Sequence, residues 1–421
     1  MTETNVTTSP KHSIDKALLL VVLALMTLGI VMIYSASNVI AAQKFGSSMH
    51  FLKQQIIRVV LGFGILVFAA KFDYHRYRSK TMMMMLVAFI LCLIVLGLGS
   101  LKGSARWLQI GGFGIQPSEI AKLALIFYIA AYLDGKGERI KDFQHGLLPP
   151  LIMAAVFCGM IVLQPNFSTA STLMMIVLIL LFIGGMRIKH LFGLAAAVIP
   201  IGLIIVMMSP YRLERLKTFL NPSSDIQGSG YQIKQSLISF GNGGLTGVGV
   251  GQGKQKLLFL PEPFTDFIYS IVGEELGFIG AVFVLILFVV FLFRAIKIAR
   301  TAPDLYGFYI ATGIVVSIVL YALINAGVAV GILPTTGLPM PFISYGGTSL
   351  LFTCFTIGVL LNISSQTVPK EQALKKTSAG AEHNNFTDNF NIDDDEPVAT
   401  GESQPVSKPV KRPSIVGLDL S

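Results

Sequence analysis

The residues best suited to chemistry lie in one polar stretch, residues 228–280, between long apolar segments. Within this stretch the run PEPFTDF contains Glu262 and ends with Asp266 and a phenylalanine, directly before another apolar run. A carboxylate at a membrane–water boundary can take a proton from a hydroxyl group or hold a divalent cation. Asp266 could instead cap the helix that follows, which is a common structural role. Asp266 is therefore the candidate chemical centre, with the capping role as the alternative.

Three basic residues precede this stretch on a short amphipathic segment, namely Arg212, Arg215 and Lys217. Arginine can bind phosphate oxygens through two parallel hydrogen bonds, so such a group suits a phosphate or pyrophosphate ligand. Simple attraction to anionic lipid headgroups is the competing interpretation.

A second charged group lies earlier in the chain. Glu119 and Lys122 are three residues apart, so they share one face of a helix, and they fall within an apolar segment. Paired charges inside a membrane span are by default a hypothesis of function. Arg106 and Trp107 precede them, and Trp107, the single tryptophan of the chain, would by itself suggest only an anchor at the membrane interface.

The glycine-rich part of the polar stretch, GNGGLTGVGVGQG, ends at Gly253. Glycines permit close approach of the backbone and can form concavities of N–H groups that bind anions, although a flexible loop is the simpler interpretation. The sequence contains no HExxH motif, nucleophile elbow or phosphate-binding P-loop, and its three cysteines are isolated within apolar runs.

Composition places the chain in the membrane. Of its 421 residues 53% are hydrophobic and only 13% are charged, about half of the charged fraction that is usual in a soluble domain. Lysine and arginine lie mainly in short loops between apolar runs, so the net charge of +9 reflects topology and does not indicate a nucleic-acid partner.

The pattern predicts an all-α fold with about ten transmembrane helices. The expected spans are approximately 17–37, 54–70, 81–99, 115–133, 146–163, 167–185, 190–208, 267–293, 305–332 and 342–364. Alternate loops are richer in lysine and arginine, which predicts that both termini are cytoplasmic and that Asp266 lies outside.

Three regions are expected from this arrangement: a cytoplasmic segment 1–16, a membrane domain 17–364, and a tail 365–421. The domain has one long extracytoplasmic loop, 209–265, with some helix along the membrane surface. The tail is polar and lacks apolar runs, so we expect it to be disordered and cytoplasmic.

Three stretches carry a specific resemblance: SLKGSARWLQIGGFGIQPSEIAKL, the whole of the polar stretch, and NAGVAVGILPTTGLPMPFISYGGTSLLF. In order and wording they resemble the SEDS family (shape, elongation, division and sporulation), whose branches are represented by FtsW, RodA and SpoVE. The resemblance covers about residues 16–365, and its wording is closer to the division branch.

The resemblance implies a ten-helix peptidoglycan glycosyltransferase that polymerises lipid II at the outer face of the cytoplasmic (inner) membrane, at the division septum. It places the essential aspartate of the family on Asp266, which would activate the 4-hydroxyl of the acceptor sugar in an inverting reaction, directly or with a divalent cation such as Mg²⁺ or Mn²⁺. Basic groups would stabilise the undecaprenyl pyrophosphate leaving group. The candidate substrate-binding residues are Arg106, Trp107, Glu119, Lys122, Arg212, Arg215, Lys217, Glu262, Ser344 and Gly346. The implied partners are lipid II, membrane lipid, a class B penicillin-binding transpeptidase and other division proteins.

Three positions depart from the family pattern. A basic residue of the second span is Gln54 here, and Arg58, one helical turn later, is its candidate replacement. An aspartate of the fifth-to-sixth connection is Asn166, so no metal or proton role is assigned to it. A histidine two residues before the catalytic aspartate is Phe264.

Other functions remain open at this point. The chain could be an elongation-type polymerase, or a transporter that moves lipid II or another polyprenyl-linked precursor, because intramembrane charges and broken helices serve both purposes. A purely structural scaffold for division proteins would leave Asp266 dispensable.

Overall fold

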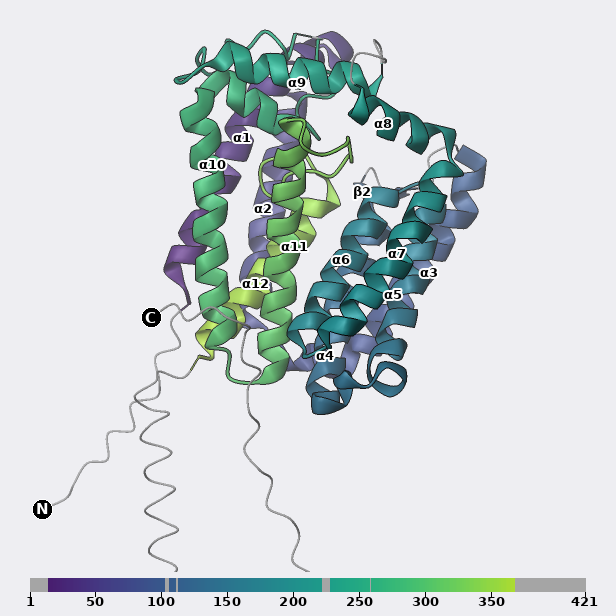
Figure 1. Cartoon of the computed structure of the whole chain (residues 1–421). Coiled ribbons are helices and arrows are strands. Elements are labelled where there is room, and N and C mark those ends of the chain that lie inside the picture. Colours follow the sequence, from purple (N-terminus) through teal and green to yellow (C-terminus); the bar gives the residue numbers. More distant parts are fainter. Residues whose placement is uncertain (1–13, 103–105, 111–112, 222–227, 258, 368–421) are drawn as a thin grey trace, which may run out of the picture.

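The computed structural model describes residues 14–102, 106–110, 113–221, 228–257 and 259–367. The long helices of these residues run side by side along one direction, as Figure 1 shows. They are α1 (Lys16–Phe45), α2 (His50–Lys71), α3 (His75–Lys102), α4 (Pro117–Lys136), α5 (Leu148–Leu163), α6 (Phe167–Ile183), α7 (Ile188–Met207), α10 (Ile268–Arg300), α11 (Leu305–Ala329) and α12 (Thr348–Ser365). Each overlaps one of the ten predicted spans, so the predicted all-α membrane fold is confirmed.

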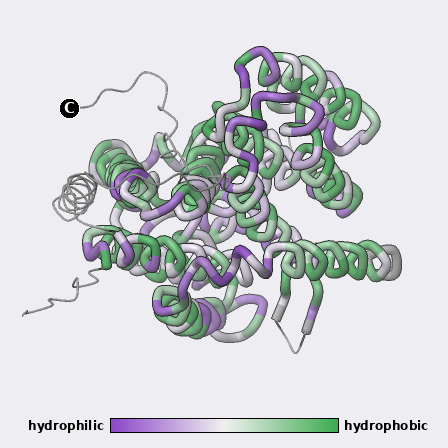
Figure 2. The backbone as a smooth tube through the Cα atoms, turned by 90° about the horizontal axis from the view of Figure 1, so that it is seen from below, coloured by the Kyte–Doolittle hydropathy of each residue, from purple (hydrophilic) through white to green (hydrophobic). Residues whose placement is uncertain are grey.

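The helices are apolar on their outer faces as well as within the bundle. Eight helical segments of the described chain are long and apolar enough to cross a membrane, α6 is apolar but shorter, and α4 carries the Glu119 and Lys122 charges. Phe68 and Phe278 point outward with 66% and 61% of their surface exposed. Figure 2 shows the same apolar character along most of the helical tubes. Such surfaces require a lipid environment, and the chain is a multi-pass membrane protein.

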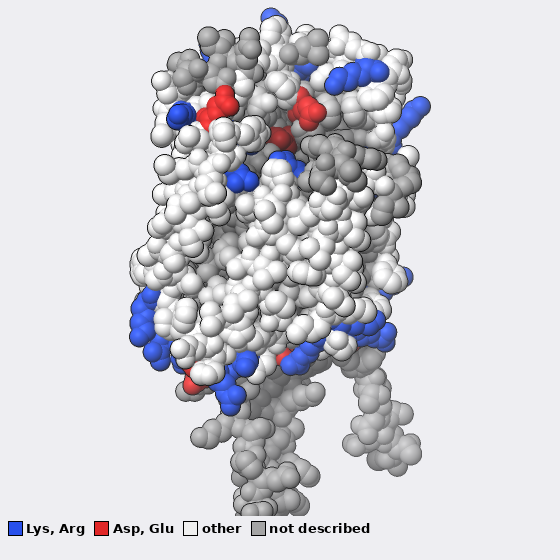
Figure 3. All heavy atoms as spheres, turned by 90° about the vertical axis from the view of Figure 1, so that its right-hand side faces the viewer, with Lys and Arg blue, Asp and Glu red and all other residues white. Residues whose placement is uncertain are grey.

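Charged side chains gather at the two ends of the bundle. On the face drawn in Figure 3, lysine and arginine side chains mark the lower end, acidic and basic side chains occur together near the upper end, and a band without charged residues separates them. This band is the distribution expected of a membrane-spanning bundle.

The first and last helices meet at the lower end. The backbone N–H of Asp15, before α1, donates to Ser364 Oγ in α12 at 3.1 Å, and Arg294 near the end of α10 pairs with the Asp15 carboxylate at 2.6 Å. An even number of spans accounts for this arrangement.

The long connection between α7 and α10 lies at the opposite end. It contains α8 (Pro210–Leu220) and α9 (Ser229–Gly243), and Figure 1 shows α9 lying across the top of the bundle. Helix along the surface was predicted for this loop. The short ribbon of β1 (Leu108–Ile110) and β2 (Phe113–Ile115) was not predicted, because strands of three residues give almost no periodic signal. The expected tail lies outside the described residues from residue 368 onward.

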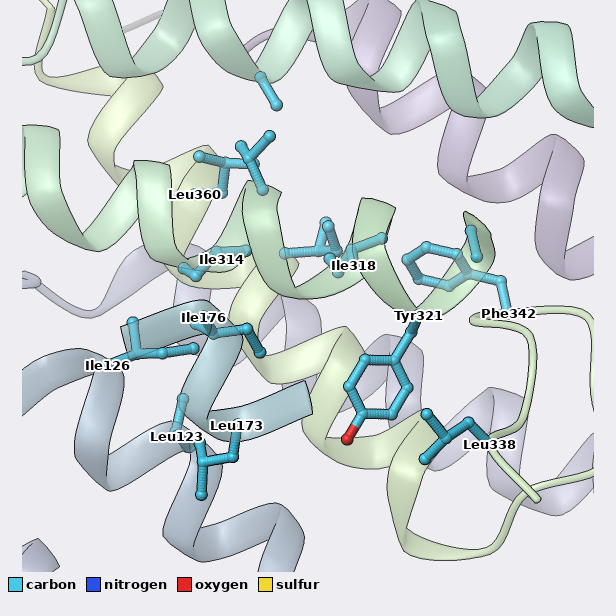
Figure 4. Close-up of a cluster of buried hydrophobic side chains, with 14 of the residues drawn as sticks. Leu123, Ile126, Leu173, Ile176, Ile314, Ile318, Tyr321, Leu338, Phe342 and Leu360 are labelled. Carbon is cyan, nitrogen blue, oxygen red and sulfur yellow. The ribbon is translucent and has the colours of Figure 1, made fainter. Parts of the chain in front are cut away.

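Helix α11 is central to the packing, since it contacts α4, α6, α10 and α12. Figure 4 shows side chains of α4, α6 and α11 meeting in one buried cluster, among them Ile126, Ile176 and Ile318. The last helix begins at Thr348, six residues later than predicted, because residues 338–347 form a loop in which Phe342 has a left-handed backbone (φ 66°). This loop returns toward the α9–α10 connection that carries Asp266.

Candidate active site

Asp266 lies in a tight turn just before α10. Glu262 takes a left-handed backbone conformation (φ 45°), and its carbonyl accepts hydrogen bonds from the N–H and hydroxyl of Thr265 at 3.1 and 2.9 Å. The cap of α10 is Phe267 and is not supported by a side chain, so the capping role considered for Asp266 is wrong. The carboxylate of Asp266 therefore has no structural task in the helix that follows.

Asn325 of α11 holds this turn in place. Its Nδ2 donates to the backbone carbonyls of both Asp266 and Leu338, each at 2.8 Å. A buried amide that binds two carbonyls fixes the position of Asp266 relative to the loop 338–347. The backbone N–H of Tyr345 adds a second link, because it donates to the carbonyl of Phe264 at 2.8 Å.

Two arginines act electrostatically on Asp266. Burial raises the pKa of this carboxyl to about 6 and the charge of Glu262 adds to the rise, while Arg215 and Arg106 oppose it. The Asp266 side chain is thus a stronger base than an ordinary aspartate and is still mainly ionised at pH 7. These are the properties required of a general base.

Arg106 and Arg215 both act on the charge of Asp266, and Arg212 lies close enough to act on Arg106. Arg106 donates to the carbonyl of Pro165, and Arg215 donates to the carbonyl of Thr335 at 3.0 Å. Arg212, which belongs to α8, donates at 3.3 Å to one backbone carbonyl of α5 and to one of α7. Burial and the nearby charges of Arg215 and Arg212 lower the pKa of Arg106. Among the described residues, none of the ion pairs involves these three guanidinium groups. The excess positive charge suits an anionic ligand.

Other predicted residues occupy less central places. Lys217 is exposed in the last turn of α8 and is not among the charges that act on Asp266. Trp107 is 40% exposed and packs beside the β ribbon, near Gly114. Ser344 is buried, and its hydroxyl accepts from the backbone N–H of Met340 at 2.8 Å, so it shapes the loop. Gly346 packs against Ser349, since a Cβ at this position would lie 2.6 Å from Ser349 Oγ and the serine hydroxyl would have to turn away.

Two of the three departures from the family pattern, Gln54 and Phe264, meet in one network around Tyr345. Arg58 donates to Gln54 Oε1 at 3.2 Å and lies over the Tyr345 ring at 4.4 Å, and the Tyr345 hydroxyl also donates to Gln54 at 2.5 Å. Phe264 packs against Tyr345 with ring centres 5.6 Å apart. Arg58 therefore reaches back to the position of Gln54. Asn166 accepts locally from Thr169 Oγ1 at 2.8 Å.

Glu119 and Lys122 form a second polar centre, deeper in the bundle. Their side chains pair at 2.7 Å, with 4% and 14% of their surfaces exposed, and Lys122 Nζ lies 4.2 Å from the centre of the Tyr321 ring. They line a cavity between α4, α11 and α12 whose wall includes Pro339 and Pro341. The segment that separates this cavity from Asp266 is the same loop that Asn325 holds.

The glycine-rich stretch binds anions that belong to the protein itself. The backbone N–H groups of Lys254 and Gln255 donate to the Glu274 carboxylate, and that of Gly251 donates to Glu275, at 2.9 to 3.3 Å. Gly247 is needed for this fit, because a Cβ there would lie 2.2 Å from the Glu275 carbonyl. A role of these glycines in binding an external anion is therefore not supported.

Buried Lys256 was missed by sequence reasoning. Its Nζ pairs with Glu275 at 2.6 Å and donates to Ser35 Oγ of α1 at 2.9 Å. Their side chains are 2% and 0% exposed. The available signal was a lysine just after the run of glycines, followed by two acids 18 and 19 residues later.

These geometric features agree with a comparison of sequences. The family model of the FtsW/RodA/SpoVE cell cycle proteins matches residues 15–368. The chain belongs to the FtsW/RodA/SpoVE family. Its expected membership is thus confirmed over the whole membrane domain.

Individual relatives match over most of their length. A "Probable peptidoglycan glycosyltransferase FtsW" of Trichlorobacter lovleyi is 43% identical over 83% of this chain and 93% of its own, and the "Stage V sporulation protein E" of Bacillus subtilis is 42% identical over 85% and 98%. Among solved structures, a similar chain occurs in a peptidoglycan synthase complex described as coordinating polymerization and crosslinking. It aligns with TM-score 0.71 and 26% identity, and the alignment covers 84% of this chain and 98% of that chain. RodA of Thermus thermophilus shares the fold at TM-score 0.63, 23% identity and coverage of 85% and 98%.

Proposed function

We propose that this chain is a peptidoglycan glycosyltransferase that polymerises lipid II into glycan strands, with release of undecaprenyl pyrophosphate. Relatives at about 40% identity over most of the chain bear the name of that activity. The observation that carries the proposal is the placement of Asp266: a carboxylate free of any capping role, held by Asn325 and approached by arginines at one end of a membrane bundle.

In this proposal the groups around Asp266 have distinct roles. Its carboxylate accepts the proton of the acceptor 4-hydroxyl as that oxygen attacks the anomeric carbon of the donor, and the bond to the pyrophosphate breaks. Arg106, Arg212 and Arg215 stabilise the negative charge that develops on the pyrophosphate oxygens, with the N–H groups that they do not use for backbone carbonyls. An inverting displacement needs only this one base and this stabilisation.

A divalent cation at Asp266 is the alternative to direct base catalysis. The described residues contain no cluster of three or more His, Cys, Asp or Glu side chains that could hold a metal ion. The charges that act on Asp266 come from Glu262 and two arginines, and arginines oppose a further cation. These residues do not form a metal site by themselves, so no step is assigned to a metal.

The location and partners follow as part of the same proposal. Asp266, α8 and α9 lie at the end opposite the Asp15–Ser364 contact, which supports an active site on the outer face of the inner membrane and termini in the cytoplasm. The wording of the relatives supports septal synthesis in cell division, with elongation as the alternative. The related complex that couples polymerization to crosslinking supports a class B transpeptidase as partner.

The deciding experiment uses purified protein and purified lipid II, with and without the transpeptidase and with a divalent ion or a chelator. Glycan products that depend on the protein are the expected result. Translocation of lipid II in proteoliposomes without any glycan product under these conditions would favour the transporter instead.

The pH dependence of the reaction should report Asp266. A base must be deprotonated to act, so a pKa raised to about 6 predicts that the rate at saturating lipid II rises with pH, is half-maximal near pH 6, and falls about tenfold per unit below that. The Glu262→Gln variant should have its midpoint at lower pH, because it lacks a charge that raises the pKa. A profile that is flat from pH 5 to pH 8 would contradict the role of a base with this pKa.

Removal of one partner from the Glu119–Lys122 pair should impair both folding and substrate use. Lys122→Met leaves Glu119 buried without its cation, which costs about 3–5 kcal/mol in the free energy of unfolding. The double variant Glu119→Gln with Lys122→Met should recover the stability. If the pair binds the lipid substrate, the double variant should still polymerise at least about tenfold more slowly than the wild type at low concentrations of lipid II. Wild-type kinetics of this double variant at every lipid II concentration would assign the pair to structure alone.

A further inference from the structure

A small pocket opens beside Asp266. Its lining includes Asp266, Arg215, Asn325, Thr335, Gly337 and Leu338. The mechanism proposed above uses Asp266 and assigns Arg215 to phosphate, but it leaves the remaining polar groups of this pocket without a task.

Three buried polar atoms of these residues have no hydrogen-bond partner: Asn325 Oδ1, Thr335 Oγ1 and Arg215 Nε. Asn325 and Thr335 are only 1% and 7% exposed. Buried polar atoms in folded proteins almost always have a partner, and leaving one unpaired is costly. Several in one pocket, next to a candidate base, indicate that a polar ligand completes them.

The orientation of Asn325 follows from its contacts. Its Nδ2 must face the carbonyls of Asp266 and Leu338, since both are acceptors and only the amide nitrogen can donate. Asn325 Oδ1 is therefore a free acceptor, and its position is fixed by the same bonds that fix the Asp266 turn.

Gly337 keeps the wall of the pocket open. Its backbone is left-handed (φ 72°), and a Cβ at this position would lie 3.5 Å from Asp266 Oδ2. A side chain here would be strained and would occupy space directly beside the carboxylate. The absence of a side chain leaves room for a ligand group against Asp266.

The mixture of unpaired atoms selects the class of ligand. A bare cation would use only the oxygen atoms and would be repelled by Arg215. A hydroxyl group both donates and accepts, so it can bind Asn325 Oδ1, Thr335 Oγ1 and the Arg215 N–H. This pattern favours a sugar with several adjacent hydroxyls.

We propose that this pocket is the subsite for the acceptor sugar, in which Asn325 and Thr335 bind a hydroxyl adjacent to the one that Asp266 deprotonates. This inference rests on the proposed glycosyltransferase function and specifies which residues orient the acceptor. The Asn325 amide thus has two tasks. Its Nδ2 holds the turn that carries Asp266, and its Oδ1 orients the sugar hydroxyl beside the one that Asp266 deprotonates.

The test compares lipid II with two analogues whose terminal amino sugar lacks the 3-hydroxyl or the 6-hydroxyl, the groups that flank the reacting 4-hydroxyl. Wild-type protein, Thr335→Val and Thr335→Ser are assayed for kcat/KM with each substrate. Valine has the shape of threonine without its hydroxyl, and serine restores the hydroxyl. For one analogue the wild type should lose about tenfold in kcat/KM relative to lipid II. Thr335→Val should discriminate much less, and Thr335→Ser should recover the discrimination.

Two results would overturn the subsite. The first is a wild-type protein that uses both deoxy analogues as well as lipid II, a comparison that does not depend on the folding of any variant. Alternatively, Thr335→Val discriminates as strongly as the wild type, so Thr335 does not bind the deleted hydroxyl. A wild-type protein that fails to polymerise lipid II itself would instead refute the proposed function, so the two failures are distinguishable.

Discussion

Replacement of Asp266 by asparagine is expected to abolish glycan synthesis while the protein remains folded in the membrane. Asparagine has nearly the same shape but cannot accept the proton of the acceptor hydroxyl. The backbone carbonyl that Asn325 binds is retained, so the turn should survive. Loss of a general base lowers the rate by roughly 10²–10⁴-fold, and the rate of polymerisation of lipid II by the purified variant is the measurement.

The matched control for this variant is Glu138→Gln. Glu138 is an exposed acid in the short helix Gly137–Lys141, after α4 at the other end of the bundle. It should polymerise lipid II like the wild type and show that neutralising an acid is not harmful in itself. Glycan strands of normal length and rate from Asp266→Asn would remove Asp266 from the mechanism and would favour a scaffold role.

The second large effect is expected at Lys256. Among the described residues, Lys256→Met leaves the fully buried Glu275 carboxylate with the Ser35 hydroxyl and the Gly251 N–H as its remaining partners. Breaking a buried ion pair by removing one member costs about 3–5 kcal/mol, because the other charge stays in a medium of low polarity. The free energy of unfolding in detergent should fall by that amount.

Lys254→Met is the control, because Lys254 belongs to the same loop and its side chain is exposed. Its unfolding free energy should change by less than about 0.5 kcal/mol. Equal stability of the two variants would show that the Lys256–Glu275 pair does not hold the glycine-rich loop on α10.

The ten helices could be predicted from the long apolar runs. In lipid the backbone N–H and C=O groups of such a run must bond to each other, and a helix is the structure that allows this. The start of the last helix was misplaced because residues 342–347 are apolar enough to continue the span. Their backbone cannot do so, with Phe342 in a left-handed conformation. The composition of a segment therefore predicts whether it lies in the membrane, whereas the residue at which a helix begins depends on the backbone angles of a few residues.

The candidate site was predicted only where a motif is contiguous. Asp266 and Glu262 belong to one short run, and Arg212 and Arg215 share one turn of α8. Asn325 was not identified, because its role depends on the meeting of α11 with a turn 59 residues earlier in the chain. The glycine-rich loop was open to two interpretations for the same reason, since its partners Glu274 and Glu275 lie about twenty residues later, just before the break of α10 at Gly277 (φ 69°).

The hydrogen bond between Asp15 and Ser364 has a consequence for biosynthesis. Its two residues are 349 positions apart, so at about 5–20 residues per second the ribosome needs roughly 17–70 s between them. During that interval α1 and α2 are already in the bilayer, but their neighbours α10 and α12 have not yet been made. The helices α3 to α6, in contrast, can pack as soon as they emerge. The middle of the membrane domain can therefore begin to pack early in synthesis, whereas α1 and α2 meet α10 and α12 only after those late helices have been made.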